Sequence, residues 1–164
     1  MRTLLLLGLI VVGCAREAPP PANPAEPYAG TWEGRSAVTG SDSGATWTIQ
    51  MTATAEGLVT GNLTFAGSGA APISMRTIEL SDSGIVFEMG PYESPTAKGQ
   101  VITRSEGRVS GDSLWGTFVM LPTKGGGVVP DMSVAQWHNA ETAPSPGSEP
   151  IRGTFVATRR QPMP

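Results

Sequence analysis

Residues 47 to 54 read Trp-Thr-Ile-Gln-Met-Thr-Ala-Thr, and this stretch decides the fold class. Apolar side chains occupy every second position, and threonine or glutamine fills the positions between them. An alternation with a period of two places one face of a β-strand in a core and the other in water. Glu56-Gly57 follows as a tight-turn signal, and Val59 to Phe65 continues the alternation beyond it. The stretch therefore predicts a hairpin with one buried face.

The same signs recur along the chain, where short apolar segments alternate with turn signals rich in glycine, serine and aspartate. Gly90-Pro91 is expected to end one strand, Ser105-Glu106-Gly107 is expected to form a hairpin turn, and a change of phase before Ile78 predicts a β-bulge. No window of ordinary helix length shows an apolar stripe. Strands are expected at residues 30–38, 47–54, 59–65, 73–80, 85–89, 99–104, 108–121 and 151–160.

A short phrase recurs at Gly30-Thr31-Trp32, Gly116-Thr117-Phe118 and Gly153-Thr154-Phe155. Glycine permits a bend, and we expect the aromatic residue two places on to pack across it. Strongly coiled strands, as in a small barrel, need such bends. Closing the sheet into a barrel also removes its exposed edges. We predict an all-β protein, an antiparallel meander of about eight strands closed into a small barrel. A flattened β-sandwich is the alternative.

Composition excludes several classes of function. The 164 residues carry a formal net charge of −3, and only 15% of them are charged. Without a basic cluster, the chain has no electrostatic basis for binding nucleic acid. One cysteine, Cys14, and one histidine, His138, provide neither an internal disulfide nor a usual zinc site. We therefore expect no metal and no cofactor.

The N-terminus has the pattern of a secretory signal. Arg2 precedes the apolar run Leu4 to Val12, which is too short to cross a bilayer as a helix. Val11-Val12-Gly13-Cys14 resembles the lipobox of bacterial lipoproteins. The resemblance implies acylation of Cys14, a membrane anchor and a place in the cell envelope, and Ala15 after the cysteine favours the outer membrane. An ordinary cleaved signal with an incidental cysteine is the alternative.

These signals divide the chain into four parts. Residues 1–13 form the expected signal peptide, and residues 14–27 form the acylated cysteine with a proline-rich tether. Five prolines between Ala15 and Pro27 favour an extended spacer. The barrel is expected at 28–160, interrupted by a long loop at 122–150 that we expect to fold across one mouth as a lid. Residues 161–164 are a C-terminal tail.

Gly30-Thr31-Trp32 near the start of a meander that ends in Arg159 and Arg160 resembles a lipocalin or calycin-type barrel. The resemblance implies that Trp32 stacks with one of these arginines and closes one end. It also implies a small apolar ligand inside the barrel. The chain departs from the family in having no further signature, no disulfide and no helix-like segment before the last strand. Trp32 as an ordinary core aromatic therefore stays open.

The candidate ligand site is the barrel interior, because methionine gives a soft wall that suits a guest of irregular shape. The alternative is a core that fills the barrel completely. The long loop adds the neighbouring pair Trp137 and His138. The candidate ligand-binding residues are Trp47, Met51, Phe65, Met75, Phe87, Met89, Trp137 and His138.

The sequence contains no recognisable catalytic set. Gly-x-Ser-x-Gly is absent, and the carboxylates fall on expected polar faces or turns. We therefore assign no catalytic residue. The leading hypothesis is a membrane-anchored barrel that binds a small apolar ligand. An equal hypothesis is a structural or interaction lipoprotein that has a solid core and binds an envelope protein. An enzyme centred on His138 is the third hypothesis.

Overall fold

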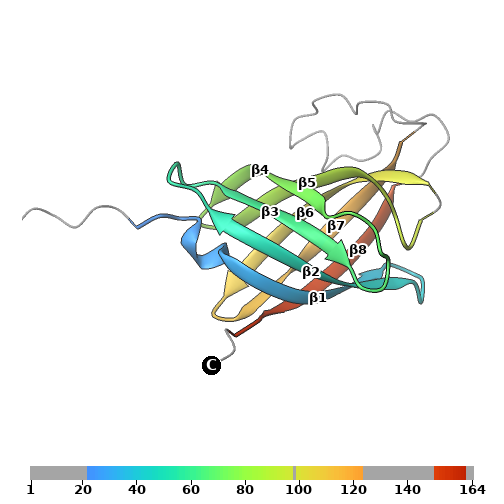
Figure 1. The fold of residues 1–164 in the computed structure, drawn as a ribbon, viewed down its shortest axis with the longest axis horizontal. Helices are drawn as coiled ribbons and strands as arrows, with labels where there is room; N and C mark the ends of the chain where they lie inside the picture. Colours follow the sequence, from blue (N-terminus) through green and yellow to red (C-terminus); the bar gives the residue numbers. More distant parts are fainter. Residues whose placement is uncertain (1–21, 98, 124–149, 162–164) are drawn as a thin grey trace, which may run out of the picture.

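The computed structural model describes residues 22–97, 99–123 and 150–161 (Figure 1). Eight antiparallel strands follow one another in sequence order and close into a barrel with a mean axis radius of 8 Å. The predicted fold class is thereby confirmed. The elements are the 3₁₀ turn η1 (Glu26–Tyr28) and the strands β1 (Gly30–Val38), β2 (Gly44–Ala53), β3 (Val59–Phe65), β4 (Ile73–Ser81), β5 (Gly84–Glu93), β6 (Gln100–Ser110), β7 (Ser113–Pro122) and β8 (Ile151–Arg159).

Pairing between the first and last strands closes the barrel. β1 and β8 pair antiparallel over seven residues, from Trp32 opposite Arg159 to Val38 opposite Gly153. Neither strand is left with a free edge along this length, so the sheet exposes no template for pairing with another chain there. This pairing excludes the flattened sandwich.

The meander gives the barrel two different ends. The β2–β3, β4–β5 and β6–β7 connections lie at one end, together with η1 and the end of β8 (Figure 1). We call this the closed end. The β1–β2, β3–β4 and β5–β6 connections lie at the opposite end, where β7 also finishes and β8 begins. We call this the rim.

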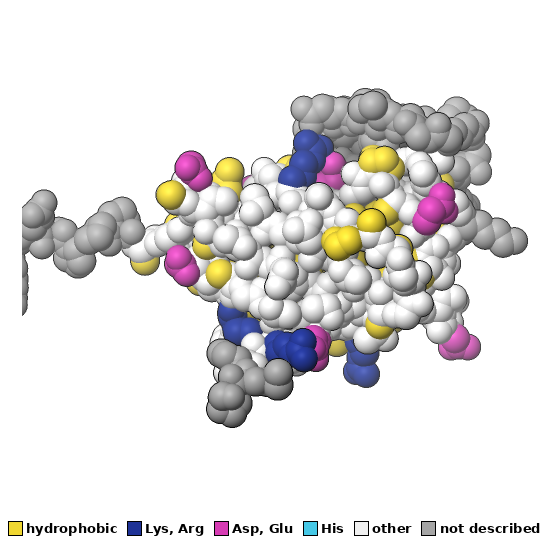
Figure 2. Space-filling view, in the orientation of Figure 1, with side chains coloured by type: hydrophobic (Ala, Val, Ile, Leu, Met, Phe, Trp, Pro, Cys, Tyr) yellow, Lys and Arg dark blue, Asp and Glu magenta, His cyan; other side chains and the backbone are white. Residues whose placement is uncertain are grey.

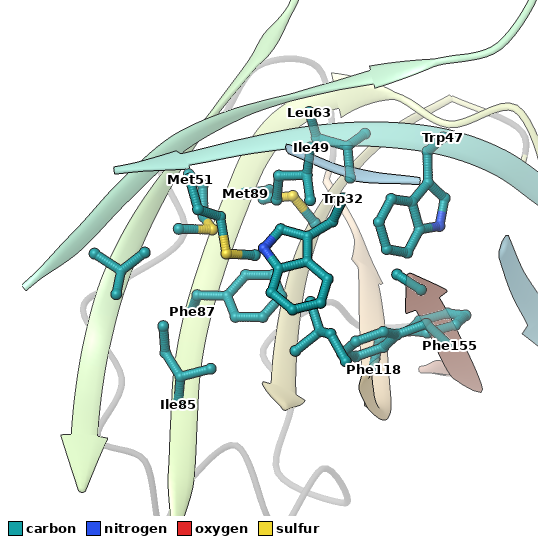
Figure 3. Packing of buried hydrophobic residues seen from close by; sticks show 14 of the residues in the cluster. Trp32, Trp47, Ile49, Met51, Leu63, Ile85, Phe87, Met89, Phe118 and Phe155 are labelled. Carbon is teal, nitrogen blue, oxygen red and sulfur yellow. The ribbon is translucent and has the colours of Figure 1, made fainter. Parts of the chain in front are cut away.

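The alternation in β2 and β3 is confirmed in three dimensions. Trp47, Ile49, Met51, Val59 and Leu63 are buried in the core, and the threonines between them face outward. Figure 3 shows large apolar side chains from different strands pointing toward one another in the interior. Figure 2 shows that the outer face over β1 to β3 is mostly uncharged, with the charged side chains toward its margins.

Glycines face aromatic rings across neighbouring strands. Gly34 is opposite Trp47 in the β1–β2 pair, Gly116 is opposite Phe155 in the β7–β8 pair, and Phe118 is opposite Gly153. A Cβ on Gly34 would lie 2.6 Å from Trp47 Cζ2, and one on Gly116 would lie 2.7 Å from Phe155 Cζ. Each ring therefore occupies the space that a side chain on the opposite residue would need. The phrases at Gly116 and Gly153 are thus partners across strands, and the expectation that each of their aromatic residues packs across its own glycine is corrected.

Several strand bounds differ from those predicted; β2, for example, begins at Gly44 rather than at residue 47. Gly90-Pro91 does not end β5, which continues to Glu93. The expected turn at Ser105-Glu106-Gly107 is wrong, because β6 runs unbroken through it and the turn lies at Gly111-Asp112. Gly111 has a φ of 56°, which suits a two-residue hairpin, whereas the glycine at 107 is extended and buried. The bulge predicted near Ile78 is confirmed by a register shift between Thr77 and Glu79.

The last residues of the expected tether belong to the closed end. Asn23 Nδ2 donates a hydrogen bond of 2.9 Å to the Thr54 carbonyl, and Ala25 is fully buried. The 3₁₀ turn, which includes Pro27, packs this segment against the barrel. Cys14, Trp137, His138 and most of the expected loop 122–150 lie outside the described residues.

Candidate functional site

Trp32 is the central side chain of the closed end. It has no exposed surface, and its indole lies in the middle of the apolar cluster in Figure 3. The indole Nε1 donates a hydrogen bond of 2.8 Å to the Tyr28 carbonyl in η1. A buried Trp needs such a partner for its N–H. The bond therefore fixes both the ring and the 3₁₀ turn that covers it.

Arg159 lies over the Trp32 ring, with its Cζ 4.2 Å from the ring centroid. Its guanidinium donates hydrogen bonds to the carbonyls of Ala29 and Pro27 and forms an ion pair with Asp112. A cation over an indole face is attracted by the ring quadrupole. One guanidinium thus joins β8, β1 and the N-terminal turn, which completes the closed end.

Arg160 does not reach the ring. Its Nη1 lies 3.4 Å from Glu33 Oε1, and more than half of each of these two side chains is exposed. Of the two arginines that the sequence singled out, Arg159 is the one that the structure brings to Trp32.

The interior of the barrel holds a cavity of about 50 Å³. One water molecule needs roughly 10–15 Å³ on this scale, so the space holds several waters or part of a small ligand. It reaches from the core to the rim residues Ser36, Ala45 and Thr96. The lining consists of Ser36, Ala45, Trp47, Ile49, Met51, Leu63, Phe65, Phe87, Met89, Tyr92, Ser94, Thr96, Thr103, Ser105, Leu114, Phe118, Met120 and Phe155.

Five of the six described candidate ligand residues line this cavity: Trp47, Met51, Phe65, Phe87 and Met89. The sixth, Met75, is buried in the core but does not line the cavity. The structure therefore brings most of the set together around one space.

A buried polar pair interrupts the apolar lining. Tyr92 Oη and Thr103 Oγ1 are 2.7 Å apart, and both residues are buried. The Tyr92 ring also packs against Phe65, with ring centroids 5.7 Å apart. Ser105, likewise buried, follows Thr103 by two positions on the same inward face of β6.

A β-bulge aims Tyr92 inward. Met89 is opposite Thr103 and Tyr92 is opposite Val101, so three steps along β5 match two along β6. In a regular strand, residues three apart point to opposite faces. The extra residue, accommodated where Gly90 and Pro91 are both exposed, returns Tyr92 to the interior.

Burial raises the pKa of the Tyr92 phenol above its ordinary value, and the hydrogen bond with Thr103 opposes this in part. Burial disfavours the charged phenolate because a low-dielectric interior solvates it poorly. Tyr92 therefore remains a neutral hydroxyl that can donate a hydrogen bond at physiological pH.

Among the lining residues that the structure describes, none carries a charge. The described part of the chain also contains no cluster of three or more His, Cys, Asp or Glu side chains able to hold a metal ion. Within those same residues, no helix has both the length and the apolar character needed to span a membrane. The described site thus offers dispersion contacts and neutral hydrogen bonds.

Comparisons of the chain with protein-family models, with curated proteins and with solved structures gave no match.

Sequence reasoning missed the polar part of the site. Tyr92 followed the expected strand end at Gly90-Pro91, so it was not placed on an inward face. Thr103 and Ser105 come two and four positions after the apolar Val101, and this period-two spacing was the signal that could have placed them on its inward face. Polar residues at inward positions of a strand otherwise mimic an outer face.

Proposed function

We propose that this protein is a lipocalin-like barrel that binds a small apolar ligand through its rim. The observation that carries the proposal is a cavity lined by apolar side chains in a barrel that is closed at the other end by Trp32 and Arg159. Ligand sites are typically apolar hollows with a few convergent polar groups. Met51, Met89 and Met120 have flexible side chains, so their movement can enlarge the space for a guest.

The experiment compares a plugged barrel with a matched control. Ala45 is half-buried and lines the cavity near the rim, whereas Ala37 is exposed on the outer face of the adjacent strand β1. A ligand that binds only the folded state raises Tm. We expect near-saturating cumene (isopropylbenzene) to raise the Tm of the wild type and of Ala37→Trp by about 3 °C. The Tm of Ala45→Trp should not change.

No change in Tm with cumene in any of the three proteins contradicts ligand binding in the barrel. An equal rise in Tm in all three proteins means that cumene binds outside the barrel, because the tryptophan of Ala45→Trp would then not block its site.

We further propose that Cys14 is acylated and holds the protein in the cell envelope, at the outer membrane. The lipobox-like Val11-Val12-Gly13-Cys14 at the end of an apolar run supports this. Stable anchoring needs more than one acyl chain, which the lipoprotein resemblance provides. Cys14→Ser is expected to lose both fatty-acid labelling and sedimentation with membranes. Persistent labelling of that variant contradicts the anchor.

One observation favours the alternative of an interaction lipoprotein. Trp115 and Val156 are opposite each other on the outer face of β7 and β8. The exposed fraction is 41% for Trp115 and 48% for Val156. Arg108 precedes Trp115 in the same cross-strand row, and Arg35 follows Val156. Aromatic and arginine side chains are enriched at protein interfaces. This face suits an envelope protein with an apolar, acidic surface.

That alternative has its own test. A photo-crosslinking side chain at Thr117, beside Trp115 on the outer face of β7, should capture one partner in cells, and Trp115→Ser should abolish the product. The same side chain at Thr48 of β2 serves as the control. A product that persists in Trp115→Ser contradicts a role for this face.

A further inference from the structure

The Tyr92–Thr103 pair has hydrogen-bonding capacity that its own bond does not use. Each hydroxyl has one proton to donate and two lone pairs to accept with. The 2.7 Å contact between Oη and Oγ1 uses one proton, so a second O–H remains for another acceptor. Both residues line the cavity, so a guest held there lies beside this hydroxyl pair.

The rest of the lining determines which guests that space tolerates. No described lining residue is charged, so an ionised carboxylate or ammonium would lose its hydration without gaining an opposite charge. A hydrocarbon without an oxygen or nitrogen atom would give the buried O–H no acceptor. A neutral carbonyl or ether oxygen accepts the O–H without bringing a charge into the barrel.

We propose that the ligand is a neutral, slender lipophile with an oxygen acceptor that binds the Tyr92–Thr103 hydroxyl pair. The inference rests on the proposed function, since it specifies the chemistry of the ligand in the same cavity. A raised pKa of Tyr92 is consistent with it, because the phenol then stays protonated as a donor.

The bulge in β5 supports a role beyond packing. An inward Tyr92 requires an irregular strand with Gly90 at a φ of 115°, where a Cβ would lie 2.8 Å from the Val101 carbonyl. A regular strand with an apolar residue at the inward position would fill the core without this cost. Bulges that re-aim a side chain are frequent beside binding sites.

The test uses three molecules of nearly equal shape. Cumene has no acceptor, acetophenone has a neutral carbonyl in place of one branch, and benzoate carries a charge at the same place. Their dissociation constants are measured by calorimetry at pH 7 for the wild type and for Tyr92→Phe/Thr103→Val. This double variant removes both hydroxyls but keeps the shape of both side chains, and replacing both partners in this way is nearly neutral for stability.

We expect the double variant to bind acetophenone about tenfold more weakly than the wild type does, with the affinity for cumene unchanged. Benzoate should bind the wild type at least tenfold more weakly than acetophenone. The control is Thr48→Val, which removes a hydroxyl from the outer face of β2, away from the cavity lining. Thr48→Val should leave the affinity for acetophenone unchanged.

The infrared band of the bound acetophenone carbonyl gives a readout that needs no variant. A hydrogen bond from Tyr92 or Thr103 should lower its frequency below that in an apolar solvent.

The outcomes separate the two proposals. If none of the three molecules binds the wild type, the proposed function fails and this inference fails with it. Another outcome is that cumene binds the wild type while the double variant loses no more affinity for acetophenone than for cumene. In that case the apolar site stands and the role of the hydroxyl pair is overturned. Tightest binding of benzoate, or an unshifted carbonyl band, overturns the inference as well.

Discussion

Arg159 and Arg160 are adjacent in sequence but have different environments. Arg159 stacks on Trp32 and donates to two backbone carbonyls, whereas Arg160 forms an exposed ion pair with Glu33. Exposed ion pairs contribute little to stability, and a stacked guanidinium with carbonyl partners contributes more. We predict that Arg159→Met lowers the free energy of unfolding by about 2 kcal/mol.

Arg160→Met is the matched control, with an expected loss below about 0.5 kcal/mol. Urea denaturation monitored by Trp fluorescence measures both. Equal losses in the two variants would show that the closed end does not depend on the stacked arginine.

Tyr92 gives a prediction at high pH, because the chain has only two tyrosines, at positions 28 and 92. Burial raises the pKa of Tyr92 above 10.0, so the folded state holds this proton more tightly than the unfolded state does. The resulting stabilisation is complete below about pH 10 and is lost as the pH rises through the pKa of the folded protein. The free energy of unfolding should therefore fall more steeply above pH 10 in the wild type than in Tyr92→Phe.

Ultraviolet absorbance of the phenolate reports the same event. In the folded wild type, the phenolate of Tyr92 should form only above pH 10. A folded Tyr92 that ionises at the ordinary pH of a free tyrosine would contradict its burial.

At the scale of elements, the glycine–aromatic pairs give β7 and β8 their close packing. Gly116 has Phe155 over it, and a Cβ there would also clash with the Glu106 carbonyl. Gly107, directly opposite Gly116 in the β6–β7 pair, has no neighbour nearer than 3.3 Å to an added Cβ. We predict that Gly116→Ala costs about 3 kcal/mol through overpacking, whereas Gly107→Ala costs less than about 1 kcal/mol.

Thermal denaturation of the two variants tests the pairs. Similar Tm values for Gly116→Ala and Gly107→Ala would mean that the ring of Phe155 moves aside freely, which a tightly packed barrel does not permit.

The same elements show what sequence periodicity can predict. β2 and β3 alternate strictly, so their inward residues follow from the sequence, although β2 begins at Gly44, three residues before the predicted start. β5 and β6 do not, since a bulge at Gly90-Pro91 reverses the alternation and Thr103 and Ser105 place polar groups inside. Periodicity assigns polar residues to the outer face or to turns. It therefore predicted a turn at Ser105-Glu106-Gly107, where β6 is continuous.

At the scale of the whole molecule, closure of the barrel was predicted, whereas the sequence left open whether the interior holds a ligand cavity or a filled core. Whether inward side chains fill a barrel depends on stagger between strands, and that stagger is fixed by bulges and by pairing of β1 with β8. Such pairings join residues more than a hundred positions apart. Met89 lines the cavity, whereas its partner across the sheet, Met75, does not.

The described N-terminal segment enters at the closed end, opposite the rim. If Cys14 anchors the chain as proposed, the protein attaches to the membrane from the end that carries Trp32 and Arg159. The rim then lies at the opposite end of the barrel, which suits a ligand delivered from the aqueous side.

On the proposed function, the interior beside Met51, Met89 and Met120 receives a small neutral ligand. Methyl-¹³C NMR of methionine tests it most directly, because these side chains line the cavity and Met75 does not. Titration with acetophenone should shift the methyl resonances of Met51, Met89 and Met120 in a saturable way, with a smaller effect on Met75 and none in Ala45→Trp. Resonances that stay in place throughout the titration of the wild type would contradict the account.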